Sequence, residues 1–129
     1  MIVEVNDAEF IDRFLALPEN DTFWSEIGHP MKMPSSLKYL YEDGCMMILE
    51  DIVGGFGIHL ACEKGSRGGA AVRFSKRVFG LLREDCKGCR ILARIQRHRK
   101  DVMLIARLAG MVEYGVRDTH VYFEVKKCH

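Results

Sequence analysis

The chain has 129 residues, of which 48% are hydrophobic and 29% are charged, and its net charge is +1. This balance is typical of one globular domain and excludes a disordered or fibrous chain. No apolar run approaches the roughly 20 residues that span a bilayer, and residues 1–7 lack the basic segment and apolar core of a secretory signal. We therefore expect a single domain over residues 1–129, located in the cytoplasm, with no membrane partner.

The cysteines are five in number and scattered: Cys45, Cys62, Cys86, Cys89 and Cys128. An odd number in a chain expected to be cytoplasmic favours reduced thiols over a disulfide framework. Only Cys86 and Cys89 have zinc-ligand spacing, and His98, Cys128 and His129 do not supply a second tight pair. We therefore expect no metal, and interpret this pair as incidental thiols in a turn made by Gly88.

The charge is unevenly divided between the two halves of the chain. Residues 1–63 hold 3 basic and 12 acidic side chains, whereas residues 64–129 hold 16 basic and 6 acidic ones. A basic half attracts a polyanion such as a nucleotide cofactor or a nucleic acid, and an acidic half attracts a cationic amine. The alternative is that oppositely charged faces only keep the domain soluble.

Two helices are predicted near the N-terminus, after a first strand at residues 2–5. Asn6 and Glu9 have the spacing of a capping box, so we expect Asn6 to cap a helix that Pro18 ends. Apolar side chains recur along this helix at helical spacing: Phe10, Ile11, Phe14, Leu15 and Leu17. A second, shorter helix is expected to begin at Asp21.

A meander of three antiparallel strands is predicted next. Segments 37–41, 45–53 and 56–62 are apolar and extended, and turn signals at residues 42–44 and 54–55 separate them. Turns as tight as these join neighbouring antiparallel strands.

The second half of the chain alternates helices and strands. An amphipathic helix follows the glycine-rich residues 63–71, and a strand at 90–96 comes after it. Residues 100–109 form the next helix, closed by Gly110, and residues 121–125 alternate as the last strand. Strand–helix–strand connections predict parallel pairing. We therefore expect an α/β (α+β) fold: a mixed sheet with an antiparallel N-terminal meander, a parallel C-terminal strand pair and helices on both faces.

The glycine-rich loop gives the main chemical signal. Glycines let the backbone approach a ligand and point N–H groups into one concavity, and the following helix adds the positive end of its dipole. Phosphate groups bind at such places. The residues in position are Ser66, Arg67, Gly68, Gly69, Ala70 and Ala71. The loop matches neither a Walker A motif nor a dinucleotide fingerprint, and the alternative is a connection without a ligand.

The loop and the order of elements resemble the GNAT superfamily of N-acetyltransferases over about residues 45–125. The signature of that family, Gln/Arg-x-x-Gly-x-Gly/Ala, corresponds here to Ser66-Arg-Gly-Gly69-Ala-Ala71, with Ser66 at the first position. In the later helix the family often has Asn, then Ala, then Tyr, then Gly-Phe. The corresponding positions here hold Arg99, Val102, Ala106 and Gly110-Met111.

The resemblance implies acetyl-CoA as the cofactor and transfer of an acyl group from acyl-CoA to a primary amine of a protein or a small molecule. A backbone N–H near Ala61 or Cys62 would polarise the acetyl carbonyl. The full set of implied cofactor contacts comes from one strand, the loop and the two helix starts: Ala61, Cys62, Ser66, Arg67, Gly68, Gly69, Ala70, Ala71 and Arg99.

The resemblance also implies places for catalysis and for the acceptor. The amine must lose a proton to a general base, for which His59 and Glu63 are the candidates. Their alternatives are a half-buried packing histidine and a surface charge. Tyr114 is the candidate acid for the leaving thiolate, and Tyr122 is also available. Residues expected around the acceptor, unless they are simply core, are Trp24, Met31 and Tyr39.

Two other functions remain open. The usual Asn and Tyr are replaced by Arg99 and Ala106, which favours a catalytically silent GNAT-fold interaction protein, similar to some short tailed-phage proteins of the virion or directed at a host protein. A nucleic-acid binder is not favoured, because such sites interleave basic charge with exposed aromatic rings. Between residues 64 and 113 the only aromatic residues are Phe74 and Phe79. The chain is expected to be a monomer or a homodimer.

Overall fold

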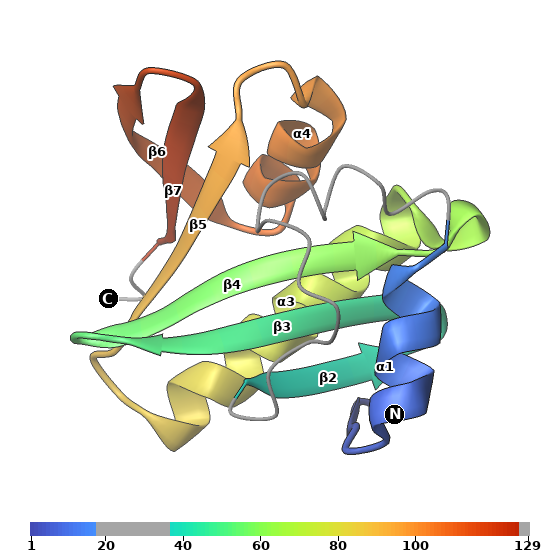
Figure 1. Cartoon of the computed structure of the whole chain (residues 1–129). Coiled ribbons are helices and arrows are strands. Elements are labelled where there is room, and N and C mark those ends of the chain that lie inside the picture. Colours follow the sequence, from blue (N-terminus) through green and yellow to red (C-terminus); the bar gives the residue numbers. More distant parts are fainter. Residues whose placement is uncertain (18–36, 127–129) are drawn as a thin grey trace.

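The computed structural model describes residues 1–17 and 37–126, which fold into one mixed sheet with helices on both faces (Figure 1). The elements in chain order are β1 (Val3–Glu4), α1 (Ala8–Leu15), β2 (Lys38–Glu42), β3 (Cys45–Ile52), β4 (Gly55–Cys62), a 3-10 turn (Lys64–Ser66), α3 (Gly69–Asp85), β5 (Arg90–Gln96), α4 (Lys100–Leu108), β6 (Met111–Arg117) and β7 (His120–Val125).

The strand order is β1-β2-β3-β4-β5-β7-β6, and every neighbouring pair except β4 and β5 is antiparallel. The predicted meander is confirmed, because Glu42 pairs with Cys45 across the first tight turn and Ile52 with Gly55 across the second. The predicted fold class, a mixed α/β sheet with an antiparallel N-terminal part and a parallel pair after it, is therefore confirmed.

Strands β4 and β5 are joined at one end only. Their parallel register runs over three residue pairs, from Gly55 with Arg90 to Gly57 with Leu92. From Leu92 to Gln96 the other edge of β5 pairs with β7. The two strands consequently diverge as a V in Figure 1, with α4 at its open side.

Two apolar clusters cover the opposite faces of the sheet. The larger includes α3 and α4, and the smaller, which we call the α1-face cluster, consists of Ile11, Phe14, Leu15, Tyr39, Met46, Ile48 and Ala61. Figure 1 shows α1 in front of the sheet and α3 behind it. Because successive residues of a strand point to opposite faces, β4 contributes Ile58 and Cys62 to the larger cluster and Ala61 to the α1-face cluster. His59 lies on the same face as Ala61.

Helix α1 begins at a different cap from the one predicted. Oδ1 of Asp7 accepts hydrogen bonds from the backbone N–H groups of Glu9 at 3.0 Å and Phe10 at 3.3 Å. The prediction of Asn6 as the cap is therefore wrong by one residue, because both side chains suit a cap and only the backbone conformation chooses between them. Ile11, Phe14 and Leu15 are buried as expected. The helix expected from Asp21 lies outside the described residues.

A strand that was not predicted changes the C-terminal topology. Residues 111–117 form β6, which pairs with β7 through a turn in which Asp118 has a φ of 52°. This extra strand reverses the chain, so β7 runs antiparallel to β5 and not parallel to it. Parallel pairing in the described chain is confined to β4 and β5.

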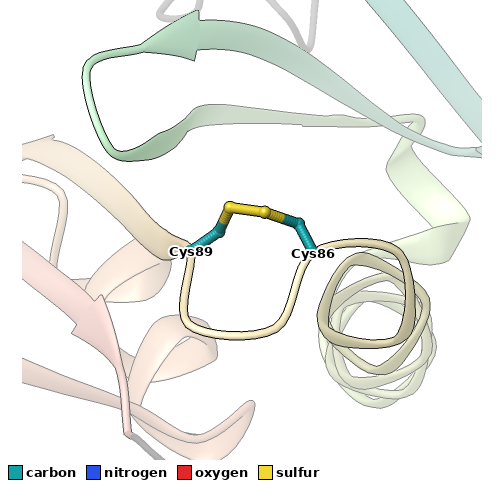
Figure 2. The surroundings of a disulfide bond; sticks show 2 residues. All are labelled: Cys86 and Cys89. Carbon is teal, nitrogen blue, oxygen red and sulfur yellow. A yellow bond between two sulfur atoms is a disulfide. The ribbon is translucent and has the colours of Figure 1, made fainter.

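Helix α3 ends in a disulfide between Cys86 and Cys89, shown in Figure 2. The bond spans a turn in which Gly88 has a φ of 84°. The predicted turn is confirmed, but the expectation of reduced, incidental thiols is wrong for this pair. Cys45 and Cys62 are free and buried.

Two kinds of feature are absent from the residues that the structure describes. No group of three or more His, Cys, Asp or Glu side chains in residues 1–17 and 37–126 is arranged to hold a metal ion. Within the same ranges, the helices are too short or too polar for any of them to cross a membrane.

Candidate active site

A cavity of about 260 Å³ opens where β4 and β5 separate. Its walls come from β4, β5, the glycine-rich loop and α4, and they are mainly apolar. A few polar residues are among those that line it: His59, Arg67, Ser75, Arg94, Arg99 and Asp101. A concave apolar channel with a few polar groups is the usual form of a small-molecule site.

Arg67 and Gly68, in the loop that leads into α3, line one part of the cavity, which we call its mouth. Gly68, the N-cap residue of α3, has a φ of 91° and a ψ of −127°, a conformation that a residue with a Cβ rarely adopts. The first helical hydrogen bond runs from the N–H of Val72 to the carbonyl of Gly68 at 3.0 Å. The N–H groups of Gly69, Ala70 and Ala71 therefore have no acceptor within the helix. Arg67 and Gly68 line the cavity beside them.

Ser66 has a different position from its neighbours in the motif. Its hydroxyl donates to the backbone carbonyl of Asp43 at 2.8 Å, and its own carbonyl accepts from the thiol of Cys45 at 3.6 Å. The side chain is buried against the β2–β3 turn, where a Cβ on Gly44 would overlap its Oγ. Ser66 thus anchors the loop to the meander and is not among the residues that line the cavity.

Two buried thiols lie beneath the same loop. Cys45 and Cys62 face each other across β3 and β4 with their sulfur atoms 3.7 Å apart. The hydrogen bond to Cys45 and burial raise the pKa of Cys62 far above its usual range. Cys62 lines the cavity, but it does so as a neutral thiol and not as a nucleophile.

His59 is the titratable side chain on the α1 face of β4. Its Nε2 lies 3.7 Å from Oε2 of Glu50 in β3, and 20% of its side chain is exposed. Burial, followed by the positive charge of Arg94, lowers the pKa of His59, while Glu50 acts in the opposite direction. The net lowering keeps the imidazole neutral at neutral pH, which is the form that accepts a proton.

The far wall carries an ion pair at the start of α4. The guanidinium of Arg99 donates to both carboxylate oxygens of Asp101 at 3.2 Å. This hydrogen bonding holds the pKa of Asp101 below its usual value. Arg99 is thus fixed beside the cavity at the position where the sequence predicted a cofactor contact. Ala106, in the following turns of α4, lines the same wall.

The other predicted side chains lie away from this cavity. Glu63 is exposed at the end of β4, with its carboxylate against Gly44. Tyr114 is 48% exposed on β6, with its ring 6.0 Å from that of Tyr122. Tyr39 is buried in the α1-face cluster. The remaining predicted acceptor residues, Trp24 and Met31, lie outside the described residues.

Two residues of the site were missed by sequence reasoning. The first is Arg94. The alternation of strand 90–96 places Arg94 on the face opposite Ile91 and Ile95, but it does not show that His59 of another strand lies on that same face. The partner of His59, Glu50, reads in the sequence as a surface charge at the end of a strand. Only the register between β3 and β4 brings the two together.

Comparison with known proteins supports the fold and not a specific activity. No family model and no curated protein matches the sequence. The structure is similar to the N-acetyltransferase PseH of Campylobacter jejuni in complex with acetyl coenzyme A, with a TM-score of 0.65, 14% identity and coverage of 99% of this chain and 100% of that one. It is also similar to AAC(6')-Ib in complex with paromomycin and acetyl-CoA, with a TM-score of 0.73, 14% identity and coverage of 98% and 93%.

A third similar structure is a variant of the spermidine N-acetyltransferase SpeG of Vibrio cholerae, with a TM-score of 0.71, 11% identity and coverage of 97% of this chain and 94% of that one. All three matches extend over nearly the whole length of both chains. The chain therefore has the fold of the GNAT N-acetyltransferases.

Proposed function

We propose that this protein is an N-acyltransferase that takes an acetyl group from acetyl-CoA and transfers it to a primary amine. The observation that carries the proposal is the separation of β4 from β5 after Gly57, with a cavity between them and the start of α3 at its mouth. Similar folds whose structures are complexes with acetyl-CoA support it. In the cytoplasm, where we expect the protein, acetyl-CoA is available as a donor.

The residues around the cavity fit acetyl-CoA. A diphosphate needs several N–H donors and positive charge, which the first turn of α3 and Arg67 supply at the mouth. The narrow arm of the cofactor needs an apolar channel with backbone groups along it, and the open edge of β4 provides this. Arg99, beside the far wall, is a second cation within the same cavity.

The bound acetyl-CoA supplies the activated acyl group, and the chain supplies what surrounds it. A backbone N–H near Ala61 is the donor that would stabilise negative charge developing on the carbonyl oxygen. His59 lies two residues earlier on the same face of β4, about 7 Å along the strand. Glu63, the other candidate base, is held at the β2–β3 turn, and we give neither it nor Tyr114 a part in the transfer.

A second candidate is an acyl-CoA-binding protein without catalysis. Ala106 occupies the wall where related sequences often have a tyrosine, and no tyrosine of the described residues lines the cavity. A protein of this kind would bind acetyl-CoA through the same loop but release no thiol. The two functions therefore differ in turnover and not in binding.

The test is binding followed by turnover. Acetyl-CoA should raise the melting temperature of the full chain in proportion to the logarithm of its concentration, because a ligand that binds only the folded state stabilises it. Release of free thiol should then depend on an added amine, with spermidine, paromomycin and a lysine-containing peptide as acceptor probes. No thermal shift at millimolar acetyl-CoA would refute both candidates, and a shift without thiol release from any of the three would favour the second.

A further inference from the structure

The α1 face of the sheet carries a row of charged and titratable side chains across three neighbouring strands. Glu50 of β3 pairs with Gly57 of β4, so Glu50 and His59 are diagonal neighbours on one face. Arg94 of β5 continues the row, because the burial of Ile91 and Ile95 fixes that strand's other face in the core. The row begins at the protein surface and ends in the cavity.

Glu50 and His59 differ in how far their side chains are exposed to solvent. The side chain of Glu50 is 54% exposed, and that of His59 is only 20% exposed and reaches the cavity wall. Their nearest atoms, Oε2 and Nε2, are 3.7 Å apart, which is longer than a hydrogen bond but within ion-pair range. A proton added to the imidazole would therefore meet a carboxylate already in place.

The charged groups around His59 shift its pKa in opposite directions. Arg94 from β5 disfavours the imidazolium and Glu50 from β3 favours it, while burial disfavours it most. Arg67, Arg99 and Asp101 line the same cavity from the loop and from α4. The imidazole is thus neutral before the reaction, and the charge it gains during the reaction is balanced by Glu50.

We propose that His59 is the general base for the acceptor amine and that Glu50 is its positioning residue, an inference that rests on the proposed acyl transfer. The carboxylate beside Nε2 stabilises the imidazolium that forms when the ring accepts the proton of the amine. The amine nitrogen forms a bond to the acetyl carbon as its proton passes to His59. The carbon–sulfur bond breaks, and the thiolate of coenzyme A takes a proton from water. The hydroxide that remains is neutralised by the proton that the imidazolium of His59 returns to solvent.

Glu50 would contribute most when the charge appears. A carboxylate beside a histidine that becomes an imidazolium stabilises the transition state more than the ground state, which is the condition for an effect on kcat. The expected signature is a lower kcat without a change in the KM for acetyl-CoA. A role in folding alone would not move the titration of His59.

The first experiment follows the His59 ring by NMR between pH 4.5 and 9, with His59→Gln used to assign its signal. We expect a pKa below that of a free histidine, a further decrease in Glu50→Gln and an increase in Arg94→Gln. Asp51→Asn is the matched control, because it removes the same charge one residue along β3 and on the opposite face. An unchanged His59 pKa in Glu50→Gln would overturn the proposal, whether or not an acceptor is known.

The second experiment measures thiol release with the three acceptor probes at several pH values. His59→Gln should lower kcat by on the order of 100-fold, and Glu50→Gln by about tenfold with the acidic limb of the profile moved to lower pH. Asp51→Asn should behave as wild type. A His59→Gln variant that still binds acetyl-CoA and turns over at the wild-type rate would overturn the inference and leave the proposed function standing. Absence of acetyl-CoA binding to the wild type would instead contradict the proposed function.

Discussion

Gly57 and Leu92 form the last parallel pair between β4 and β5, and the cavity opens directly beyond them. Within the described residues, β4 makes no further strand pairing toward β5 after this point. Buried backbone N–H and C=O groups are costly to leave without partners. An open strand edge inside a domain therefore indicates a ligand that supplies those partners, and this one adjoins the loop before α3.

The junction of the V should depend on a glycine. A Cβ on Gly55 would overlap the backbone carbonyl of Arg90, so Gly55→Ala should destabilise the fold by about 1–3 kcal/mol by forcing the two strands apart. Gly57→Ala is the control in the same strand, because its Cβ would make ordinary van der Waals contacts, to Ile52 at 3.6 Å and to Glu50 at 3.9 Å. Urea unfolding of both variants measures the difference. Equal free energies of unfolding for the two variants would show that the fold does not depend on the close approach of Gly55 to the Arg90 backbone.

The charge at the cavity mouth should determine the affinity for acetyl-CoA. Arg67→Glu places a negative charge beside the expected diphosphate and should raise the Kd by about tenfold or more, as measured by calorimetry. Lys76→Glu makes the same change on an exposed position of α3 that does not line the cavity. We expect that control to bind nearly as the wild type does. Similar losses in the two variants would indicate general charge attraction instead of a site.

The disulfide at the end of α3 should make stability sensitive to reductant. The bond between Cys86 and Cys89 closes a short loop and so lowers the conformational entropy of the unfolded chain. In the chain-entropy model this stabilises the fold by about 2 kcal/mol. Dithiothreitol should lower the free energy of unfolding of the wild type by up to that amount. The double variant Cys86→Ser, Cys89→Ser should not respond to reductant. A wild type that is equally stable with and without dithiothreitol would contradict the contribution of this bond.

Alkaline pH should weaken the fold through one buried phenol. Burial, and secondly the charge of Asp12, raise the pKa of Tyr39 to about 12 from 10.0. The folded state favours the neutral phenol over the phenolate. The free energy of unfolding is therefore unaffected by this group below pH 10 and falls as the pH rises through about 12. The complete loss of stability is on the order of 3 kcal/mol.

A comparison of the wild type with Tyr39→Phe tests this pH dependence. The free energy of unfolding of the wild type should fall relative to that of Tyr39→Phe as the pH rises from 10 to 12, and the ultraviolet spectrum of the wild type should show one phenol that titrates late. A constant difference across this range would mean that Tyr39 ionises as it does in the unfolded chain.

Local sequence signals predicted most of the sheet and failed where two signals competed. The turns at Asp43–Gly44 and after Ile52 are encoded in glycine and acidic residues, so the meander was predictable. Strand β6 was not, because its apolar side chains Val112, Tyr114 and Val116 are about half exposed and resemble a connecting segment. The direction of β7 depended on β6 and was lost with it.

The candidate site divides in the same way. Arg67, Gly68 and Arg99 follow from the loop pattern and the family resemblance, and all three line the cavity. Ser66 matched a motif position, yet its hydroxyl is bound to the β2–β3 turn, a contact between residues 23 apart that no local pattern encodes. The pairing of His59 with Glu50 depends on strand register, which sequence alone did not give.

The most direct test of the account is an amide chemical-shift map of the full chain titrated with acetyl-CoA. We predict saturable shifts at Gly68, Gly69 and Ala70 and along residues 58–62 of β4, with little change on β6. The absence of saturable shifts at millimolar acetyl-CoA, or shifts confined to β6 and β7, would contradict the claim that the cleft between β4 and β5 holds the cofactor.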